Sequence, residues 1–296
     1  MNTYIAFDIG GTMIKYGLLE EDGTIIYADE CKTQAKMGGA HIMDSICEKI
    51  AKLSKQKKLS GVAISTAGMV DPIKGSILYA NDNIPNYTGT PIKEIIERTC
   101  KLPCEVENDV ACAALSEQRV GAAKGSKVSF CVTVGTGIGG CVLIDGNVFY
   151  GAGNSAGHLG YMNVFGSQFE KVASSSAMVD TVNLEKNRTK TKDRLDGKTI
   201  IQLAKDGDEV CIRAIDKMCD ILGYGIANVC CVLNPEVVVL GGGIMTQKEY
   251  LNDRMQTSLD KYLHPAIRKN TRLTFAQNGN QAGLIGAYFN FKGRQL

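Results

Sequence analysis

The sequence of 296 residues has no tryptophan, only six prolines and three histidines, and no apolar run that approaches 18 residues. The absence of such a run excludes a membrane-spanning helix. Basic and acidic residues nearly cancel to a formal net charge of +2, so nothing indicates nucleic acid or an anionic membrane as partner. Asp8 falls where a signal peptide needs its apolar stretch, and we therefore expect a cytoplasmic protein.

The cysteines also lack any pairing pattern. They number eleven, an odd count, and no CxC or CxxC pair occurs among them. Neither a disulfide framework nor a structural zinc site is expected from this spacing. We interpret the cysteines as reduced thiols that behave as small hydrophobic residues in the core.

A pattern of three strands and two turns occurs twice. Runs typical of strands cover residues 4–7, 13–19 and 24–27, and again residues 128–134, 141–144 and 147–150. In each copy a glycine-rich bend follows the first run, and an Asp-Gly hairpin signal follows the second. At about 100–200 residues per domain, the length fits two domains, and the repeat indicates that they are related.

Helices and further strands alternate outside these repeats. Helical patterns cover residues 91–99, 110–122 and 209–233, and strand patterns cover residues 61–65, 105–107 and 237–240. Asn234-Pro235 ends the longest helix. This alternation predicts an α/β fold with two sheets, and the polar residues 185–198 are interpreted as a surface excursion.

The two glycine-rich bends have the composition of phosphate loops. The first reads Asp8-Ile9-Gly10-Gly11-Thr12, and the second covers residues 135–140. Glycine permits a positive φ and close backbone approach, and the hydroxyls of Thr12 and Thr136 can donate to phosphate oxygens. Asp8 is placed to hold Mg²⁺ through water. A Gly-Gly-Thr bend can also be a plain turn, but the duplication and a third glycine run at 241–243 favour a nucleotide site.

No GxxxxGK[ST] sequence occurs, which excludes a Walker A loop. The two bends instead resemble the phosphate loops of the sugar kinase, actin and heat-shock ATPase superfamily.

Asn108-Asp109 follows a predicted strand and begins a predicted helix. One interpretation is that either residue simply caps the helix, which both residue types do well. Beside two phosphate loops, however, Asp109 is the candidate general base that deprotonates a hydroxyl for attack on the γ-phosphoryl group.

Across nearly its whole length the chain resembles the ROK family of sugar kinases and sugar-responsive repressors. The resemblance rests on the first loop, residues 65–68, 83–85, 107–109, 135–140, 156–161, 240–243 and 280–287. It implies an ATP-dependent hexose kinase of two actin-like (ribonuclease H-like) domains with a nucleotide and sugar cleft between them. The domains expected are residues 1–115 with a returning helix at about 281–296, and residues 116–280. A homodimer is implied as well.

The resemblance also implies the site residues. Those for ATP and Mg²⁺ are Asp8, Gly10, Gly11, Thr12, Thr136, Gly137, Gly241 and Gly242. Those for a small-molecule sugar are Gly68, Asn83, Asn108, Asp109, His158 and Glu170, with Asp109 as the base acting on a sugar hydroxyl, usually O6.

The chain departs from the family pattern at two positions. ROK kinases commonly carry Ala-Gly-Glu-x-Gly-His, in which the Glu contacts the sugar and the His binds a structural zinc together with nearby cysteines. Here His158 and Tyr161 stand at these places, and residues 161–170 contain no cysteine, so no zinc site is expected. An alternative for His158 is a hydrogen-bonded histidine beside a glycine-rich turn.

The zinc-free form most resembles the β-glucoside kinases of the family, which implies a substrate such as cellobiose. Glucokinase, N-acetylmannosamine kinase and fructokinase remain alternatives. A ROK repressor is the alternative from another class, but it carries a winged helix-turn-helix before the first loop, where this chain has seven residues. We therefore do not expect DNA binding; a sugar-responsive regulator without a DNA-binding domain and an actin-like or chaperone-like ATPase are the remaining alternatives.

Overall fold

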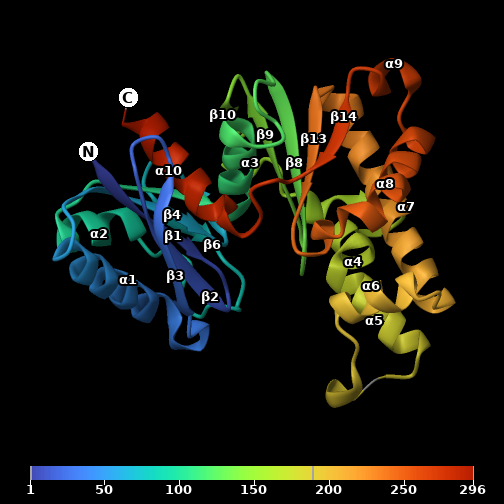
Figure 1. Cartoon of the computed structure of the whole chain (residues 1–296), viewed down its shortest axis with the longest axis horizontal. Coiled ribbons are helices and arrows are strands. Elements are labelled where there is room, and N and C mark those ends of the chain that lie inside the picture. Colours follow the sequence, from blue (N-terminus) through green and yellow to red (C-terminus); the bar gives the residue numbers. More distant parts are fainter. Residues whose placement is uncertain (1, 189, 296) are drawn as a thin grey trace. The chain divides into compact units, whose positions relative to one another are not determined.

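The computed structural model describes residues 2–188 and 190–295, which form two compact units (Figure 1). Unit 1 extends to Val120 and also contains Tyr150–Ala156 and the stretch from Asn280 onward. Unit 2 consists of Gly121–Phe149 and Gly157–Gly279.

Unit 1 is built on a five-stranded mixed sheet. Its strands, in spatial order, are β3 (Ile25–Lys32), β2 (Met13–Leu19), β1 (Thr3–Ile9), β4 (Leu59–Thr66) and β7 (Cys104–Asn108). The first three are antiparallel, and β1, β4 and β7 are parallel. The helices are α1 (Gly38–Ser54), α2 (Ile92–Cys100), α3 (Asp109–Val120) and α10 (Ala282–Arg294), and a small hairpin pairs β5 (Met69–Asp71) with β6 (Ser76–Tyr79).

The two faces of this sheet are covered by different helices. Ile5 and Phe7 of β1 pack in one buried cluster with Ile46 of α1. Tyr4, which points to the opposite face, packs in another with Tyr288 of α10. This division follows from the alternation of side chains along a strand. On the second face, α10 packs beside β1 and α3.

Unit 2 repeats the same sheet. Its strands, in spatial order, are β10 (Asn147–Val148), β9 (Ile138–Ile144), β8 (Val128–Val134), β13 (Val237–Gly241) and β14 (Arg272–Phe275). The helices are α4 (Phe169–Ala173), α5 (Ser175–Glu185), α6 (Gly197–Lys205), α7 (Glu209–Leu233), α8 (Lys248–Tyr262) and α9 (Pro265–Arg268), with a hairpin of β11 (Asn163–Val164) and β12 (Ser167–Gln168). Short 3₁₀ turns in the chain are η1 (Ala35–Met37), η2 (Leu159–Tyr161), η3 (Thr191–Asp193), η4 (Ile244–Thr246) and η5 (Gly279–Gln281).

The predicted α/β fold with a repeated three-strand pattern is confirmed. In both units the first strand pairs antiparallel with the second and parallel with a later strand. The predicted bounds of β2, β8 and α7 match the structure, and Asn234 ends α7 in a left-handed conformation with φ 45°.

Other predictions were wrong in their bounds. The second glycine-rich bend does not extend to Gly140, because β9 begins at Ile138 and not at Cys141. The third strand does not end at Tyr27 but continues to Lys32, because Asp29 and its neighbours pair with β2 although their side chains are exposed. The strand expected at 147–150 ends at Val148, and the helix expected at 110–122 ends at Val120. In the part of the chain that the structure describes, no helix is long and apolar enough to cross a membrane.

Candidate active site

The first glycine-rich bend is held from behind by a buried threonine. Thr33 donates from Oγ1 to the carbonyl oxygen of Gly10 at 2.6 Å, and its N–H donates to the carbonyl oxygen of Thr12 at 2.9 Å. Gly11 and the Thr12 side chain are exposed. The bend is therefore fixed on its inner side and open on its outer side, where a phosphate group can approach.

Asp8 lies at the end of β1, beside this bend. The hydroxyl of Ser65 on β4 donates to Asp8 Oδ1 at 2.7 Å. Burial raises the pKa of the Asp8 carboxyl, and the Ser65 hydrogen bond and the charge of Lys15 act against this rise. Asp8 is thus an oriented carboxylate, as a ligand of a hard cation must be.

Asp109 is the first residue of α3, directly after β7, as predicted. Burial raises the pKa of its carboxyl to about 6, and the charge of Asp8 adds to this rise. Its Oδ1 accepts from the backbone N–H of Val110 at 2.9 Å, and this bond lowers the pKa. A carboxylate that titrates near neutral pH has the proton affinity a general base needs.

Asn108 caps helix α3. Its Oδ1 accepts from the N–H groups of Val110 and Ala111 at 2.9 and 3.2 Å. Its Nδ2 donates to the carbonyl oxygen of Gly68 at 2.8 Å and to Asp109 Oδ1 at 2.9 Å. The capping role that the sequence left open for either residue is therefore performed chiefly by Asn108.

Gly68, in the turn between β4 and β5, and Asn83 both belong to unit 1. Gly68 has a φ of +100°, a conformation that favours glycine. Asn83 is exposed in the loop between β6 and α2. That loop is tied to the sheet by a hydrogen bond of 2.7 Å between the buried hydroxyls of Tyr87 and Thr66. Burial, with a contribution from the Asp109 charge, raises the pKa of Tyr87 to about 12, so this tie lies near the candidate base.

The second glycine-rich bend, in unit 2, contacts Glu170. A Cβ on Gly137 would lie 2.6 Å from Glu170 Oε2, and one on Gly160 would lie 2.5 Å from the same atom. Gly10, Gly11 and Gly137 do not have a positive φ. The need for glycine at position 137 therefore comes from the close approach of the Glu170 side chain and not from the backbone conformation. The Glu170 carboxylate therefore packs against the second glycine-rich bend.

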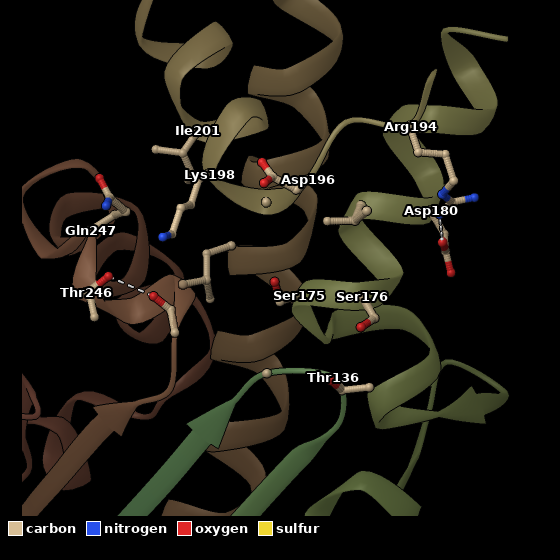
Figure 2. A pocket seen from close by; sticks show the side chains of 15 residues that line it. Thr136, Ser175, Ser176, Asp180, Arg194, Asp196, Lys198, Ile201, Thr246 and Gln247 are labelled. Atoms are coloured by element: carbon tan, nitrogen blue, oxygen red, sulfur yellow. Dashed lines mark hydrogen bonds and ion pairs between the residues drawn. The ribbon is translucent and has the colours of Figure 1, made fainter. Parts of the chain in front are cut away.

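A cavity of about 610 Å³ opens beside this bend in unit 2 (Figure 2). Side chains from α5, α6 and the turn after β13 surround it, and the second bend closes one end. Its lining residues are Gly135, Thr136, Ser175, Ser176, Val179, Asp180, Arg194, Asp196, Gly197, Lys198, Ile201, Gly243, Ile244, Thr246 and Gln247. Of the unit 2 residues predicted to bind ATP, Thr136 lines the cavity, whereas Gly137, Gly241 and Gly242 do not. Gly243, which was not among the predicted contacts, does line it.

Gly242 directly precedes the turn that contributes Gly243 and Ile244 to the lining of the cavity. It has a φ of +100°, and a Cβ there would lie 2.2 Å from the carbonyl oxygen of Val134, at the end of β8. Only glycine permits this approach, which sets the path of the turn that carries Ile244 and Thr246.

His158 precedes the turn η2 in unit 2. Burial lowers the pKa of its imidazole, so the ring is neutral at pH 7. The ring centroids of His158 and Tyr161 are 6.3 Å apart, and the side chain of Tyr161 is exposed. At position 158 the chain therefore has a neutral imidazole, where the ROK kinases that it resembles commonly have a charged glutamate.

Asp8 and Asp109 are the predicted site residues of unit 1 that carry carboxylate oxygens. Asp8 and Asp109 are close enough for the charge of one to raise the pKa of the other. Among residues 2–188 and 190–295, no three or more His, Cys, Asp or Glu side chains gather around one possible ion position. The Asp8 carboxylate fits Mg²⁺, which keeps most of its water and binds substrate phosphates.

Sequence reasoning missed the residues that support Asp109. Glu107 is 2% exposed, and its Oε2 accepts from the hydroxyl of Tyr150 at 2.5 Å. Arg294 donates from Nη2 to the same hydroxyl at 2.7 Å. The available signal was the pair Glu105 and Glu107 in a predicted strand, because a carboxylate that a sheet buries needs a partner. Ser65, which holds Asp8, carried no signal of that kind.

The structure brings the predicted residues together in two groups. Asp8, Gly68, Asn108 and Asp109 form one group in unit 1, with Gly10, Gly11, Thr12 and Asn83 in the neighbouring loops. Thr136, Gly137, Glu170, His158, Gly241 and Gly242 belong to unit 2.

Comparison of the chain with known proteins matches the ROK family over residues 4–294. An uncharacterized protein of Clostridium perfringens is 45% identical over 99% of this chain and 98% of its own length. A beta-glucoside kinase of Klebsiella pneumoniae is 30% identical over 97% of this chain and 95% of its own length.

Solved structures resemble the chain over nearly its full length. A ROK family glucokinase from Streptomyces griseus, in complex with glucose and AMPPNP, is 30% identical with a TM-score of 0.83, covering 97% of this chain and 98% of that one. A ROK family protein from Streptococcus pneumoniae, in complex with sucrose, is 26% identical with a TM-score of 0.85, covering 99% of this chain and 100% of that one. The fold is the actin-like fold of two α/β units, and the chain belongs to the ROK family.

Proposed function

We propose that this protein is an ATP-dependent sugar kinase in which Asp109 is the general base. The observation that carries the proposal is the environment of Asp109, whose pKa is raised to about 6 by burial and by the charge of Asp8. A carboxyl of this kind is ionised at pH 7 and still takes up a proton readily. The glucokinase from Streptomyces griseus, bound to glucose and AMPPNP, supports the reaction class.

In the proposed reaction the Asp109 carboxylate accepts the proton of a sugar hydroxyl, O6 by the family resemblance. The hydroxyl oxygen attacks the γ-phosphorus of ATP, the bond from that phosphorus to the bridging oxygen breaks, and ADP leaves. Mg²⁺, held by Asp8 through water, would neutralise charge on the phosphate oxygens when bound. The hydrogen bonds from Ser65 and Asn108 keep the two carboxylates oriented throughout.

We assign the nucleoside of ATP to the cavity in unit 2. Its volume of about 610 Å³ is within the range of small-molecule sites, and Val179, Ile201 and Ile244 give it apolar walls for a base. Thr136 at its closed end would meet the phosphates (Figure 2). Gly10, Gly11 and Thr12 are proposed phosphate contacts from unit 1, and Gly241 and Gly242 shape the turn beside the cavity.

For the sugar we propose contacts with Gly68, Asn83, Asn108 and Asp109 in unit 1 and with His158 and Glu170 in unit 2. The seat of Glu170 against Gly137 and Gly160 places a carboxylate beside the phosphate loop. Such a group can accept hydrogen bonds from sugar hydroxyls.

We further propose that the preferred sugar is a β-glucoside such as cellobiose. Two features of the chain support this choice: neutral His158, which makes no charge-assisted bond, and the short segment from Tyr161 to Glu170, which leaves Tyr161 exposed. The relative named beta-glucoside kinase and the relative that holds the disaccharide sucrose support it too. Glucose is the second candidate, favoured by the glucokinase complex, and N-acetylmannosamine is the third.

The test is an ADP-release assay with ATP-Mg²⁺ over a panel of monosaccharides, amino sugars and β-glucosides, with mass spectrometry of the products. A gain of one phosphate on at least one sugar is expected, with the highest kcat/KM for cellobiose or an aryl β-glucoside. Failure to phosphorylate any sugar contradicts the kinase proposal. Preference for glucose over every β-glucoside contradicts the finer choice alone.

A further inference from the structure

A continuous series of hydrogen bonds leads from the last helix to Asp109. Arg294 donates to the Tyr150 hydroxyl at 2.7 Å, and this hydroxyl donates to Glu107 Oε2 at 2.5 Å. The other oxygen of Glu107 accepts from the backbone N–H of Asn108 at 2.7 Å. The side-chain amide of the same residue donates from Nδ2 to Asp109 Oδ1 at 2.9 Å, so the series passes through Asn108 itself.

Glu107 is the centre of this series, and it depends on Tyr150. Its carboxyl is 2% exposed, and burial raises its pKa, while the bond from Tyr150 and the charge of Arg294 act against that rise. The Arg294 guanidinium is 3.9 Å from Glu107 Oε2, so the short contact to that oxygen comes from Tyr150. With one oxygen satisfied by Tyr150, the other is available to fix the backbone where β7 passes into α3.

Tyr150 also begins an unusual segment of the chain. Tyr150–Ala156 belongs to unit 1, whereas the residues on either side of it belong to unit 2. His158 is the second residue after this segment. Through its hydrogen bond to the buried Glu107 carboxylate, the Tyr150 hydroxyl therefore holds both the start of that segment and the junction of β7 and α3, which carries Asp109.

We propose that Tyr150 is a positioning residue for phosphoryl transfer, which acts through Glu107 and Asn108 to fix the direction of the Asp109 carboxylate. The inference rests on the proposed role of Asp109 as base. It assigns to Tyr150 an effect on turnover rather than on substrate binding, because neither Tyr150 nor Glu107 is among the proposed contacts of the sugar or the nucleotide.

Tyr288 provides a matched control within the same unit. It is a fully buried tyrosine of α10, and its hydroxyl donates to the carbonyl oxygen of Glu21 at 2.6 Å. This bond has no connection to Glu107 or Asp109. Tyr288→Phe removes a hydroxyl that makes one of these hydrogen bonds, and Tyr150→Phe removes a hydroxyl that makes two, so a general loss of stability affects both variants.

The experiment compares kcat, KM and the pH profile of the two variants with those of the unaltered protein. Tyr150→Phe is expected to lower kcat by about 10- to 100-fold, the order that a small misplacement of a reacting group costs. KM for sugar and for ATP should stay within about twofold. The acid limb of kcat should move to higher pH, because the Asn108 bond that lowers the Asp109 pKa is weakened. Tyr288→Phe should leave kcat and the pH profile unchanged.

An unchanged kcat in Tyr150→Phe, or an equal loss in Tyr288→Phe, overturns the inference. If Asp109→Asn lowers kcat as expected while Tyr150→Phe leaves kcat unchanged, the proposed function stands and only the positioning role fails. Should the protein phosphorylate no sugar, ¹³C NMR titration of the Asp109 carboxyl still decides the matter. A higher Asp109 pKa in Tyr150→Phe supports the positioning role, and an unchanged one overturns it.

Discussion

Gly283 leaves the space that the carboxylate of Asp8 occupies. A Cβ on Gly283 would lie 2.4 Å from Asp8 Cγ, closer than any real contact of this kind. Gly283 lies in the first turn of α10, so this helix closely approaches β1 at the candidate magnesium ligand. The requirement for glycine here comes from this approach and not from a positive φ.

Gly283→Ala is therefore expected to displace Asp8 and to lower kcat by about 10-fold or more, with a raised requirement for Mg²⁺. Gly293→Ala is the control in the same helix, since a Cβ there meets no atom within 4 Å. Alanine favours a helix over glycine, so the control should keep full activity and gain slightly in stability. Equal activity of the two variants in a Mg²⁺ titration would show that the position of Asp8 does not matter.

The pH dependence of turnover should report the base. Asp109 has a pKa of about 6, so kcat is expected to fall as the pH drops below 6 and the carboxyl takes up a proton. Asp8→Asn removes a charge that raises this pKa, so the remaining activity of that variant should persist to lower pH. A kcat profile whose acid limb stays in place in Asp8→Asn contradicts the coupling of the two carboxylates.

The purified protein is expected to contain no stoichiometric zinc and to keep its Tm in the presence of a chelator. The physical reason is that residues 161–170 offer no thiolate and place Tyr161 where a zinc-binding histidine is common in the resembling kinases. Activity should nevertheless require added Mg²⁺. Elemental analysis that finds about one zinc per chain would refute this expectation.

His158→Glu should shift the substrate preference from β-glucosides toward glucose. A glutamate at this position can make charge-assisted hydrogen bonds to ring hydroxyls, which the neutral imidazole does not provide. The measurement is the ratio of kcat/KM for cellobiose to kcat/KM for glucose in the unaltered protein and in the variant. His158→Gln, which is polar but uncharged, serves as the control and should leave the ratio nearly unchanged.

The sequence predicted the bounds of a helix or strand correctly where the local residue pattern and the tertiary structure favour the same conformation. The helix Glu209–Leu233 and the strands β2 and β8 were predicted at their true bounds because apolar periodicity and strong end signals agree there. Residues 28–32 of β3 carry no such pattern. They form a strand because β2 offers a pairing edge, which no local signal shows.

The same distinction applies to the site. The positions of Asp8 near the end of a strand and of Asp109 at the start of a helix could be predicted, because a strand pattern precedes each and a turn or helix pattern follows. The interpretation of residues 185–198 as a surface excursion missed Arg194, Asp196 and Lys198, which reach the cavity of unit 2 only because α6 packs beside α5. Contacts between residues far apart in sequence, such as Glu107 with Tyr150, depend on packing that a single sequence does not reveal.

Asp109→Asn tests the central claim most directly, because activity and stability should move in opposite directions. Asparagine cannot act as the base, so kcat is expected to fall by about 10²–10⁴-fold while calorimetry still detects sugar binding. The folded-state pKa of Asp109 is raised, so the folded protein loses stability as the pH rises from the unfolded-state pKa of this carboxyl toward 6. Asp109→Asn removes this cost, so at pH 7 the variant should be more stable by about 1–2 kcal/mol. Near-normal turnover with reduced stability in Asp109→Asn would instead make Asp109 a helix-capping residue and contradict the account.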